Sequence, residues 1–461
     1  MKRNEIDMLN GPLWSKLLLF ALPLMASSLL QLLFNAADVI VVGRFAGDAS
    51  LAAVTSTGSL VNLLVNLFMG LSIGTNVIAA HAIGRGDNEA LQRTTHTAIL
   101  VGFVGGLFLA FLGFFSVRFF LELMESPENV IDLSTLYLKI YFLGMPAMLV
   151  YNFGSSLLRA QGDTRRPMIY LAIAGVINVV LNLILVIVFH LDVAGVAIAT
   201  ILSQYISCFL VIRCLTLETG PLHLELKELS IDPGTLKNIA VIGLPAGLQG
   251  MVFSISNMVI QSSINSFGDI VMAGSGAAAN IEGFVYVSMN AFYQTCLTFT
   301  GQNYGAGKSK RVDRVILLCL GYVTLSGLIF SNLAYFFAPQ LLHIYSPSDE
   351  VVVQGIVRMT YVCIPYFLCG LMDTLVGALR GLGASLVPMC VSIIGVCGFR
   401  LVWIFTVFQS VRTPECLYIS YPISWIATAL IHACCLLVVR KRAYQRMAAA
   451  ELQLAQAASQ S

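Results

Sequence analysis

The feature that most constrains this chain is a series of long, almost uncharged apolar runs. Hydrophobic residues make up 57% of the sequence and charged residues only 11%, whereas soluble domains carry roughly 25% charged residues. About 20 consecutive apolar residues are enough to span a bilayer as a helix. We count twelve such runs, at residues 17–42, 52–82, 95–117, 131–157, 168–190, 193–215, 237–264, 273–300, 314–338, 352–378, 387–409 and 418–440. The sequence therefore predicts an all-α polytopic membrane protein with twelve transmembrane helices.

The basic residues predict how these helices are oriented. If the N-terminus is cytoplasmic, 20 of the 26 Lys and Arg residues fall in cytoplasmic segments, as the positive-inside rule requires. We therefore expect a multi-pass protein of the cell (plasma or inner) membrane with both termini in the cytoplasm. Several runs exceed the minimum length, so tilted or bent helices are expected. Pro23 lies inside the first run and is a predicted bend, because proline removes a backbone donor.

The chain also repeats itself at one fixed offset. Three short motifs recur 221 residues downstream, each in a different loop. They are Gly47-Asp48 with Gly268-Asp269, Gly84-x-Gly86 with Gly305-x-Gly307, and Arg159-x-x-Gly162 with Arg380-x-x-Gly383. Each copy holds six spans and so enters and leaves the membrane on the same side, which predicts a parallel repeat related by an axis along the membrane normal.

This repeat sets the predicted domain limits. The N-terminal lobe is expected at residues 1–215 and the C-terminal lobe at 237–442, joined by a cytoplasmic linker at 216–236 and followed by a tail at 443–461. Alternating leucines from Leu222 to Leu226 suggest a short strand in the linker.

One carboxylate, Asp38, stands inside the first run, with Asn35 and Gln31 about one and two turns before it. A charged side chain at membrane depth costs several kcal/mol and is a functional candidate by default. The alternative is that Asp38 lies near the end of its helix and reaches water at the headgroups.

Other polar residues of the first lobe are expected at a comparable depth: Asn152, Asn178, Asn182 and Thr200. Asn178 and Asn182 are four residues apart and so share a helix face. A carboxylate among neutral oxygen donors suits Na⁺, and the same carboxylate, once removed from water, could take up a proton instead. Either event neutralises Asp38 and could couple ion binding to helix rearrangement. The alternative is that the amides are interhelical hydrogen-bond partners, which membrane helices use routinely.

In the second lobe, Asp373 and Arg400 are predicted within roughly one helical turn in depth, given a rise of about 1.5 Å per residue. We therefore predict a structural ion pair between them. Glu282 has no obvious basic partner in the sequence, and Gln249, Asn257 and Gln294 are polar candidates around it. These four residues, together with Gln31 and Asn35 of the first run, are candidates for holding a proton or a substrate, and for Glu282 the alternative is a plain hydrogen-bonded role.

Several functions are not indicated. The sequence contains no P-loop, H-E-x-x-H or G-x-S-x-G motif, so no enzyme activity and no cofactor are predicted. A net charge of +2 without a basic and aromatic patch gives no sign of a nucleic-acid partner. Without a nucleotide site, uphill transport requires an ion gradient or a partner protein.

The chain resembles the multidrug and toxic compound extrusion (MATE) family over essentially its whole length. The resemblance rests on Pro23 and Asp38, Gly84-Arg-Gly86, Arg159-Ala-Gln-Gly-Asp-Thr-x-x-Pro167, Gly195-Val-Ala-x-Ala-Thr200, Gly301-Gln-Asn-Tyr-Gly-Ala-Gly307 and Leu379-Arg-Gly-x-Gly383. It implies two six-helix lobes around a cleft, alternating access, and antiport of organic cations against Na⁺ or H⁺. It also implies that Asp38, Asn152, Asn178 and Thr200 form the first-lobe cation site of the DinF-like branch, which typically has an aspartate where this chain has Asn182.

We therefore predict a secondary active multidrug exporter. Its expected partners are the lipid bilayer and small amphipathic or cationic substrates, and nothing in the sequence demands more than a monomer. The alternative on the same two-lobed plan is a flippase for lipid-linked precursors. That alternative requires several basic residues along the cleft, whereas Arg400 is the only basic residue predicted at membrane depth.

Overall fold

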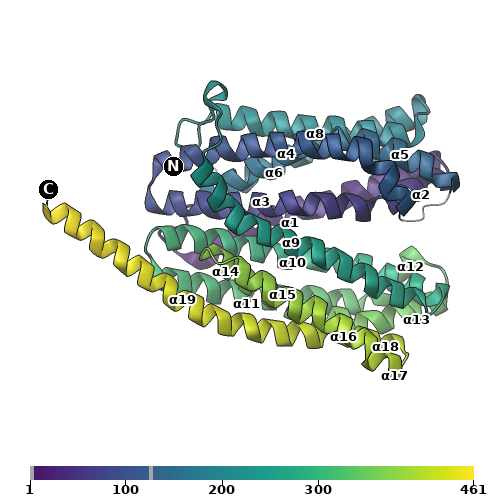
Figure 1. Ribbon diagram of the computed structural model, residues 1–461. Coiled ribbons are helices and arrows are strands. Elements are labelled where there is room, and N and C mark those ends of the chain that lie inside the picture. The colour runs from purple at the N-terminus through teal and green to yellow at the C-terminus, as the bar shows by residue number, and fades with distance from the viewer. Residues whose placement is uncertain (1–4, 124–127, 461) are drawn as a thin grey trace. The chain divides into compact units, whose positions relative to one another are not determined.

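The computed structural model describes residues 5–123 and 128–460, and every regular element among them is a helix (Figure 1). The first half contains α1 Leu13–Phe45, α2 Asp48–Ser56, α3 Gly58–Arg85, α4 Asn88–Leu123, α5 Glu128–Phe142, α6 Met145–Gln161, α7 Arg165–Leu183, η1 Ile184–Val188 and α8 Asp192–Thr216. The linker contains only the short helix η2 Leu226–Glu228, so the predicted strand is wrong.

The second half repeats this order with more interruptions. It contains α9 Pro233–Asn265, α10 Asp269–Gly305, α11 Ser309–Phe336, α12 Ala338–Tyr345, α13 Asp349–Arg358, η3 Met359–Cys363, η4 Ile364–Tyr366, α14 Phe367–Gly381, α15 Leu386–Ser392, η5 Ile393–Gly398, α16 Phe399–Phe405, α17 Val407–Ser410, α18 Pro414–Tyr418 and α19 Ser420–Gln460.

The twelve predicted spans are confirmed. Among the described residues, 11 helices are long and apolar enough to cross a membrane, and there are 12 when a bent pair is counted as one span. That pair is α5 and α6, which meet at 48°. Pro146 stands in the first turn of α6, where its missing N–H costs nothing, so the chain starts a new helix there.

The sequence repeat is also present in the backbone. Six glycines with positive φ form three pairs, each 221 residues apart. These are Gly47 and Gly268 (85° and 92°), Gly86 and Gly307 (70° and 73°), and Gly162 and Gly383 (102° and 86°). Side chains with a Cβ rarely adopt this region, so the repeated glycines fix the same turns in both halves.

The described chain forms two compact units. The first contains residues 5–6 and Ala26–Gly247, and the second contains Asp7–Met25 and residues 248–460. These limits differ from the predicted lobes because the beginning of α1 packs in the second unit and the beginning of α9 packs in the first. Both helices divide two residues after a proline, Pro23 in α1 and Pro245 in α9.

Small residues explain how α9 packs in the first unit. Gly70 and Gly74 of α3 face Gly243 and Gly247 of α9, and each pair has the G-x-x-x-G spacing that lets membrane helices approach closely. A Cβ added at Gly70 would lie 2.2 Å from the backbone nitrogen of Gly247. No larger residue fits this crossing without moving a helix.

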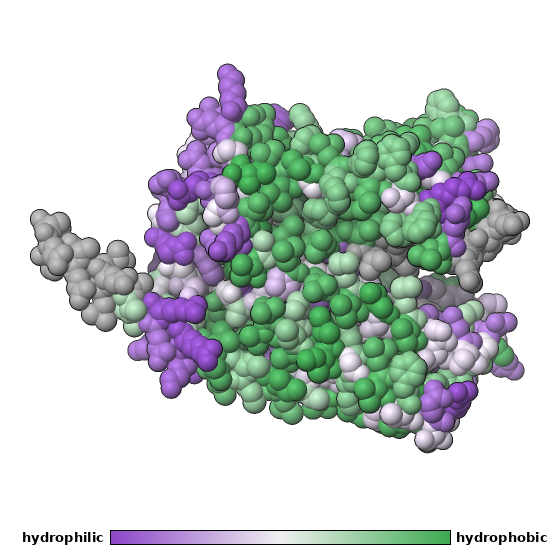
Figure 2. Space-filling view, in the orientation of Figure 1, coloured by the Kyte–Doolittle hydropathy of each residue, from purple (hydrophilic) through white to green (hydrophobic). Residues whose placement is uncertain are grey.

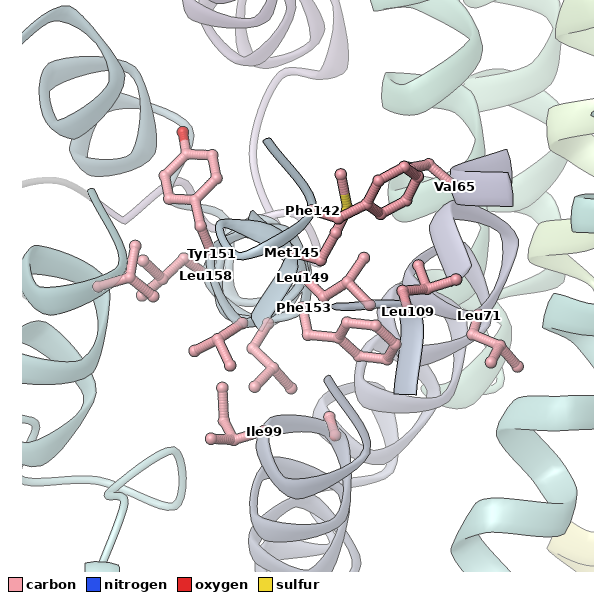
Figure 3. Close-up of a cluster of buried hydrophobic side chains, with 14 of the residues drawn as sticks. Val65, Leu71, Ile99, Leu109, Phe142, Met145, Leu149, Tyr151, Phe153 and Leu158 are labelled. Carbon is pink, nitrogen blue, oxygen red and sulfur yellow. The ribbon is translucent and has the colours of Figure 1, made fainter. Parts of the chain in front are cut away.

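The core of the first unit forms around α6. Figure 3 shows Phe142, Met145, Leu149 and Phe153 packed with Leu109 and other apolar side chains, and these four are completely buried. Apolar side chains also cover the sides of the helices, while hydrophilic side chains gather at their ends (Figure 2). This distribution is the one expected for helices with lipid along their sides and water at their ends.

A polar cavity in the first unit and a buried charge network in the second

A cavity of about 670 Å³ opens within the first unit. Helices α1, α3, α5, α6, α7 and α8 all contribute side chains to it. The sequence-predicted residues among its lining are Gln31, Asn35, Asp38, Asn152, Asn178 and Thr200. The fold thus collects, in one cavity, polar residues that are up to 169 positions apart in the chain.

A line of side-chain hydrogen bonds connects Asp38 to three predicted residues, Asn182, Asn178 and Thr200, of which Asn182 is not among the lining residues. The amide of Asn182 donates to Oδ1 of Asp38 and also, over 3.3 Å, to Oδ1 of Asn178. The amide of Asn178 donates in turn to Oγ1 of Thr200 over 3.4 Å. Asn178 and Asn182 lie on one face of α7, as their spacing predicts, and that face is directed at α1 and α8.

Asn182 is the innermost member of this line. It is completely buried, and its Oδ1 has no hydrogen-bond partner. A buried carbonyl-type oxygen without a donor is costly, and oxygen atoms are the ligands that hard cations prefer. In the described structure the amide nitrogen of Asn182 faces Asp38 and Asn178, and its Oδ1 is the oxygen atom of this line that is left without a donor.

Asn152, Gln31 and Asn35 line the cavity outside this line of bonds. The amide of Asn152 donates to the Met148 carbonyl oxygen of its own helix over 2.8 Å. Gln31 and Asn35 are exposed and lie along the same part of α1 as Asp38.

The remaining lining is neutral. Asp38 is the only charged side chain among the described residues that line the cavity. Aromatic residues stand close by, including Phe34 and a stacked pair, Tyr137 and Tyr141, whose ring centroids are 5.9 Å apart. The sequence did not lead us to predict this pair, although two tyrosines four residues apart in an apolar run share a helix face and so indicate a stacked pair. Aromatic faces and one negative charge make the cavity chemically suited to a cation.

The second unit holds a different arrangement, and two predictions about it are wrong. Glu282 does have a basic partner, since Arg358 donates from Nε and Nη2 to its two carboxylate oxygens over 3.0 and 2.8 Å. Both side chains are buried. Nη1 of Arg358 also donates to Ser275 over 3.0 Å. Arg358 lies in the predicted run 352–378, and α13, η3, η4 and α14 form one candidate span that places it beside α10.

The predicted ion pair between Asp373 and Arg400 is absent from the part of the chain that the structure describes. Asp373 accepts a hydrogen bond from the Tyr286 hydroxyl over 2.9 Å, while Nε of Arg400 donates to Ser424 over 3.0 Å. The prediction compared depth alone, which leaves the rotation of each helix open. The π-helical turn η5, directly before Arg400, changes that rotation.

The polar candidates around Glu282 are also placed elsewhere. Oε1 of Gln249 accepts from Nη2 of Arg380 over 2.8 Å, and Nη1 of Arg380 donates to the Tyr293 hydroxyl over 2.7 Å. Asn257 is exposed and Gln294 is half-buried. None of the three contacts Glu282 through a hydrogen bond in the described structure.

The repeated helices, the apolar sides and the polar cavity define a membrane transporter rather than an enzyme. The chain belongs to the MATE family, because the family model MatE matches residues 23–184 and 245–406. It is similar to two probable multidrug resistance proteins of Bacillus subtilis (strain 168). One, YpnP, is 30% identical over 84% of this chain and 87% of its own, and the other, YoeA, is 26% identical over 91% and 92%.

Solved structures agree on the fold. A transporter of the MOP superfamily from Pyrococcus furiosus superposes with a TM-score of 0.88, covering 95% of this chain and 97% of its own, at 21% identity. This likeness confirms the predicted two-lobed, twelve-helix fold, and the match to the family model confirms the resemblance to the MATE family.

Proposed function

We propose that this transporter exports small cationic or amphipathic compounds in exchange for Na⁺ or H⁺, with Asp38 as the residue that takes up the coupling ion. The observation that carries the proposal is that Asp38 is the one charged side chain among the described residues that line the first-unit cavity. A cation entering this cavity meets a carboxylate and aromatic faces, and no described lining residue repels it.

The neighbours of Asp38 support this role. Asn178, Asn182 and Thr200 supply neutral oxygen atoms, and Oδ1 of Asn182 is buried without a donor. Bound Na⁺ would supply the countercharge for Asp38, with these residues as its further ligands, and a proton would neutralise the same carboxylate. Since α1 also contains Pro23, a change of charge at Asp38 acts on a helix that already lacks one backbone hydrogen bond.

The flippase alternative requires a different cavity. A pyrophosphate-linked lipid needs several cationic side chains, and buried charges must be paired. Arg358 and Arg380 are buried in the second unit. Arg358 is paired with Glu282, and Arg380 donates hydrogen bonds to Gln249 and Tyr293. Their engagement favours a structural role over a role in binding phosphate.

We also propose the oligomeric state, the location and the lobe limits that the sequence predicts. We infer a monomer in the cell membrane with both termini in the cytoplasm, and two lobes, 1–215 and 237–442, that alternate in access as functional halves. The linker 216–236 joins them and the tail 443–461 follows, of which residues 443–460 belong to α19.

Purified protein in sealed liposomes tests the proposal. A cationic dye should leave the vesicles when a Na⁺ gradient is imposed at fixed pH, or when a pH gradient is imposed at fixed Na⁺, and the active gradient identifies the coupling ion. An anionic dye of similar size is the matched control and should not be driven. Transfer of a lipid-linked pyrophosphate without either gradient, and no dye efflux, would contradict the proposal and favour the flippase.

A further inference from the structure

The second unit carries a concentration of basic side chains where α10 ends, α11 begins and α19 leaves its apolar run. Its members are Lys308, Lys310, Arg311, Arg314, Arg440, Lys441, Arg442 and Arg446. Hydrophilic side chains gather around the point where α19 emerges from the apolar sides of the helices (Figure 2). We call these eight residues the basic surface.

Three of the eight side chains have structural partners. Lys308 and Arg311 donate to backbone carbonyl oxygens of the segment before α1, including that of Leu9 (2.9 Å) and that of Met8 (3.1 Å). Arg440 is paired with Asp313 over 3.0 Å. The other five, Lys310, Arg314, Lys441, Arg442 and Arg446, are exposed, and no described carboxylate lies within ion-pair distance of them.

The part of α19 around Tyr444 contacts α11. The hydroxyl of Tyr444 donates to Oδ1 of Asp313 over 2.7 Å and to the carbonyl oxygen of Ser309 over 3.0 Å. Lys310 and Arg314 are the chain neighbours of these two acceptors, so they flank the contact. This contact therefore brings the basic residues of α11 and α19 to the same end of the second unit, and Val439, directly before Arg440, is the last residue of the apolar run.

The repeat shows that the fold does not require this charge. The turns at Gly86 and Gly307 are equivalent, and α4 and α11 both begin two residues after them. At the 221-residue offset, however, Asp87 stands for Lys308, Glu89 for Lys310 and Ala90 for Arg311, and only Arg314 has a basic counterpart, Arg93. The positive-inside rule acts on both copies, so it does not explain why the beginning of α11 is more basic than the beginning of α4.

We propose that the basic surface binds the headgroups of anionic phospholipids in the adjacent leaflet. The complementary charge is a phosphodiester, which Arg and Lys recognise by charge-assisted hydrogen bonds. Clusters of four to eight basic residues directly beyond a membrane helix are typical of such binding, and each charge strengthens it roughly fivefold. The bilayer is the source to which the geometry points, because the surface begins where the apolar run stops.

The test is lipid binding by the full-length protein in neutral detergent, measured by native mass spectrometry. Wild type should bind phosphatidylglycerol more tightly than phosphatidylcholine of the same chain length. The triple variant Lys441→Gln, Arg442→Gln, Arg446→Gln should lose phosphatidylglycerol affinity by on the order of 100-fold, since three charges are removed, and Lys310→Gln with Arg314→Gln should lose on the order of 20-fold.

The matched control removes three exposed arginines of the first unit, by Arg85→Gln, Arg93→Gln and Arg213→Gln. It should change the affinity by less than about twofold, since a specific surface does not respond to net charge alone. Equal loss in the control, equal binding of both lipids by wild type, or displacement of the lipid by inorganic phosphate at matched concentration would each overturn the proposal. Because the experiment measures lipid binding and not transport, its result tests the basic surface even if the proposed transport function is wrong.

Discussion

Arg400 is a buried cation whose surroundings are aromatic rather than acidic. Its guanidinium carbon lies 4.0 Å from the ring centroid of Tyr421 and 5.6 Å from that of Trp425. Its Nη2 has no hydrogen-bond partner. Burying a charge is costly, and replacing it by an apolar side chain of similar size is often neutral or stabilising. The stacked geometry also suits a planar guanidinium far better than an ammonium.

We therefore expect the Arg400 variants to differ in unfolding temperature in a fixed order. Arg400→Met should unfold at the same temperature as wild type or higher, because a buried charge is removed. Arg400→Lys should lower the free energy of unfolding by about 2 kcal/mol. The lysine keeps the charge but loses the stacking on Tyr421 and the planar set of guanidinium N–H donors. Thermal unfolding in detergent, followed by tryptophan fluorescence, measures the order. A methionine variant less stable than the lysine variant would show that the charge itself stabilises the unit.

At the residue scale, the sequence predicted the first-unit cluster better than the second. Asp38 was detectable because charge is rare in apolar runs, and Asn178 and Asn182 because a four-residue spacing defines a helix face. The pair of Glu282 and Arg358 was not, since a contact between helices depends on the rotation of both. No spacing within one helix carries that information.

At the level of whole helices, the bidentate ion pair of Glu282 and Arg358 joins α10 to α13. Glu282→Gln leaves the guanidinium buried without its countercharge, which should cost about 3–5 kcal/mol. The double variant Glu282→Gln, Arg358→Met removes the orphaned charge and should recover most of that loss. Unfolding midpoints of wild type, both single variants and the double variant form a double-mutant cycle. Additive effects of the two substitutions would contradict the pairing.

The segment before α1 supplies a pH-dependent contact outside the membrane. Burial opposes ionisation of the Asp7 carboxyl, but hydrogen bonds from the Leu9 N–H and from Asn10, together with nearby Lys16, outweigh it and lower the pKa of Asp7. A lowered pKa means that ionised Asp7 stabilises the folded state above its unfolded pKa of about 3.9. That contribution is lost as the pH falls through the lower, folded value.

Comparison of wild type with Asp7→Asn tests this contact. The variant should be less stable near neutral pH by no more than about 1 kcal/mol, and the two proteins should converge as the pH falls below about 4. A difference that persists or grows in acid would mean that the carboxylate is not the stabilising form.

The helices themselves were predictable because each apolar run must satisfy its backbone internally within a bilayer. The breaks within them were harder to place. Pro146 and Pro365 mark the bent pair of α5 and α6 and the irregular turns η3 and η4, whereas the π-helical turns η1 and η5 contain no proline. Turns of this kind depend on packing between helices, which no single run encodes.

Considered as a whole, the molecule uses one scaffold twice with different chemistry. At the 221-residue offset, Val259 stands for Asp38, and Phe399, Trp403 and Tyr421 stand for Asn178, Asn182 and Thr200. Val259, Trp403 and Tyr421 all pack against the same buried apolar cluster of the second unit. The repeated glycines preserve the turns, but the polar site is confined to the first unit.

Moving the carboxylate to the second copy should therefore not restore coupling. In an Asp38→Asn background, Val259→Asp places a charge among apolar side chains without the three oxygen donors, and we expect no ion-driven efflux and a loss of about 1–3 kcal/mol in stability. Val259→Asn in the same background controls for polarity alone. If Val259→Asp restored efflux and Val259→Asn did not, the two copies would be chemically interchangeable at this position.

Asp38 is proposed to take up the coupling ion, so ion-driven efflux of a cationic dye should be measured from liposomes carrying Asp38→Asn. Asparagine keeps the size of the side chain and one acceptor oxygen for the Asn182 amide, but it removes the charge and replaces the second oxygen by an NH2 donor. Efflux should fall to the level of protein-free liposomes, while the unfolding temperature in detergent is not lowered. Efflux at the wild-type rate, with the same dependence on the ion gradient, would contradict the proposal.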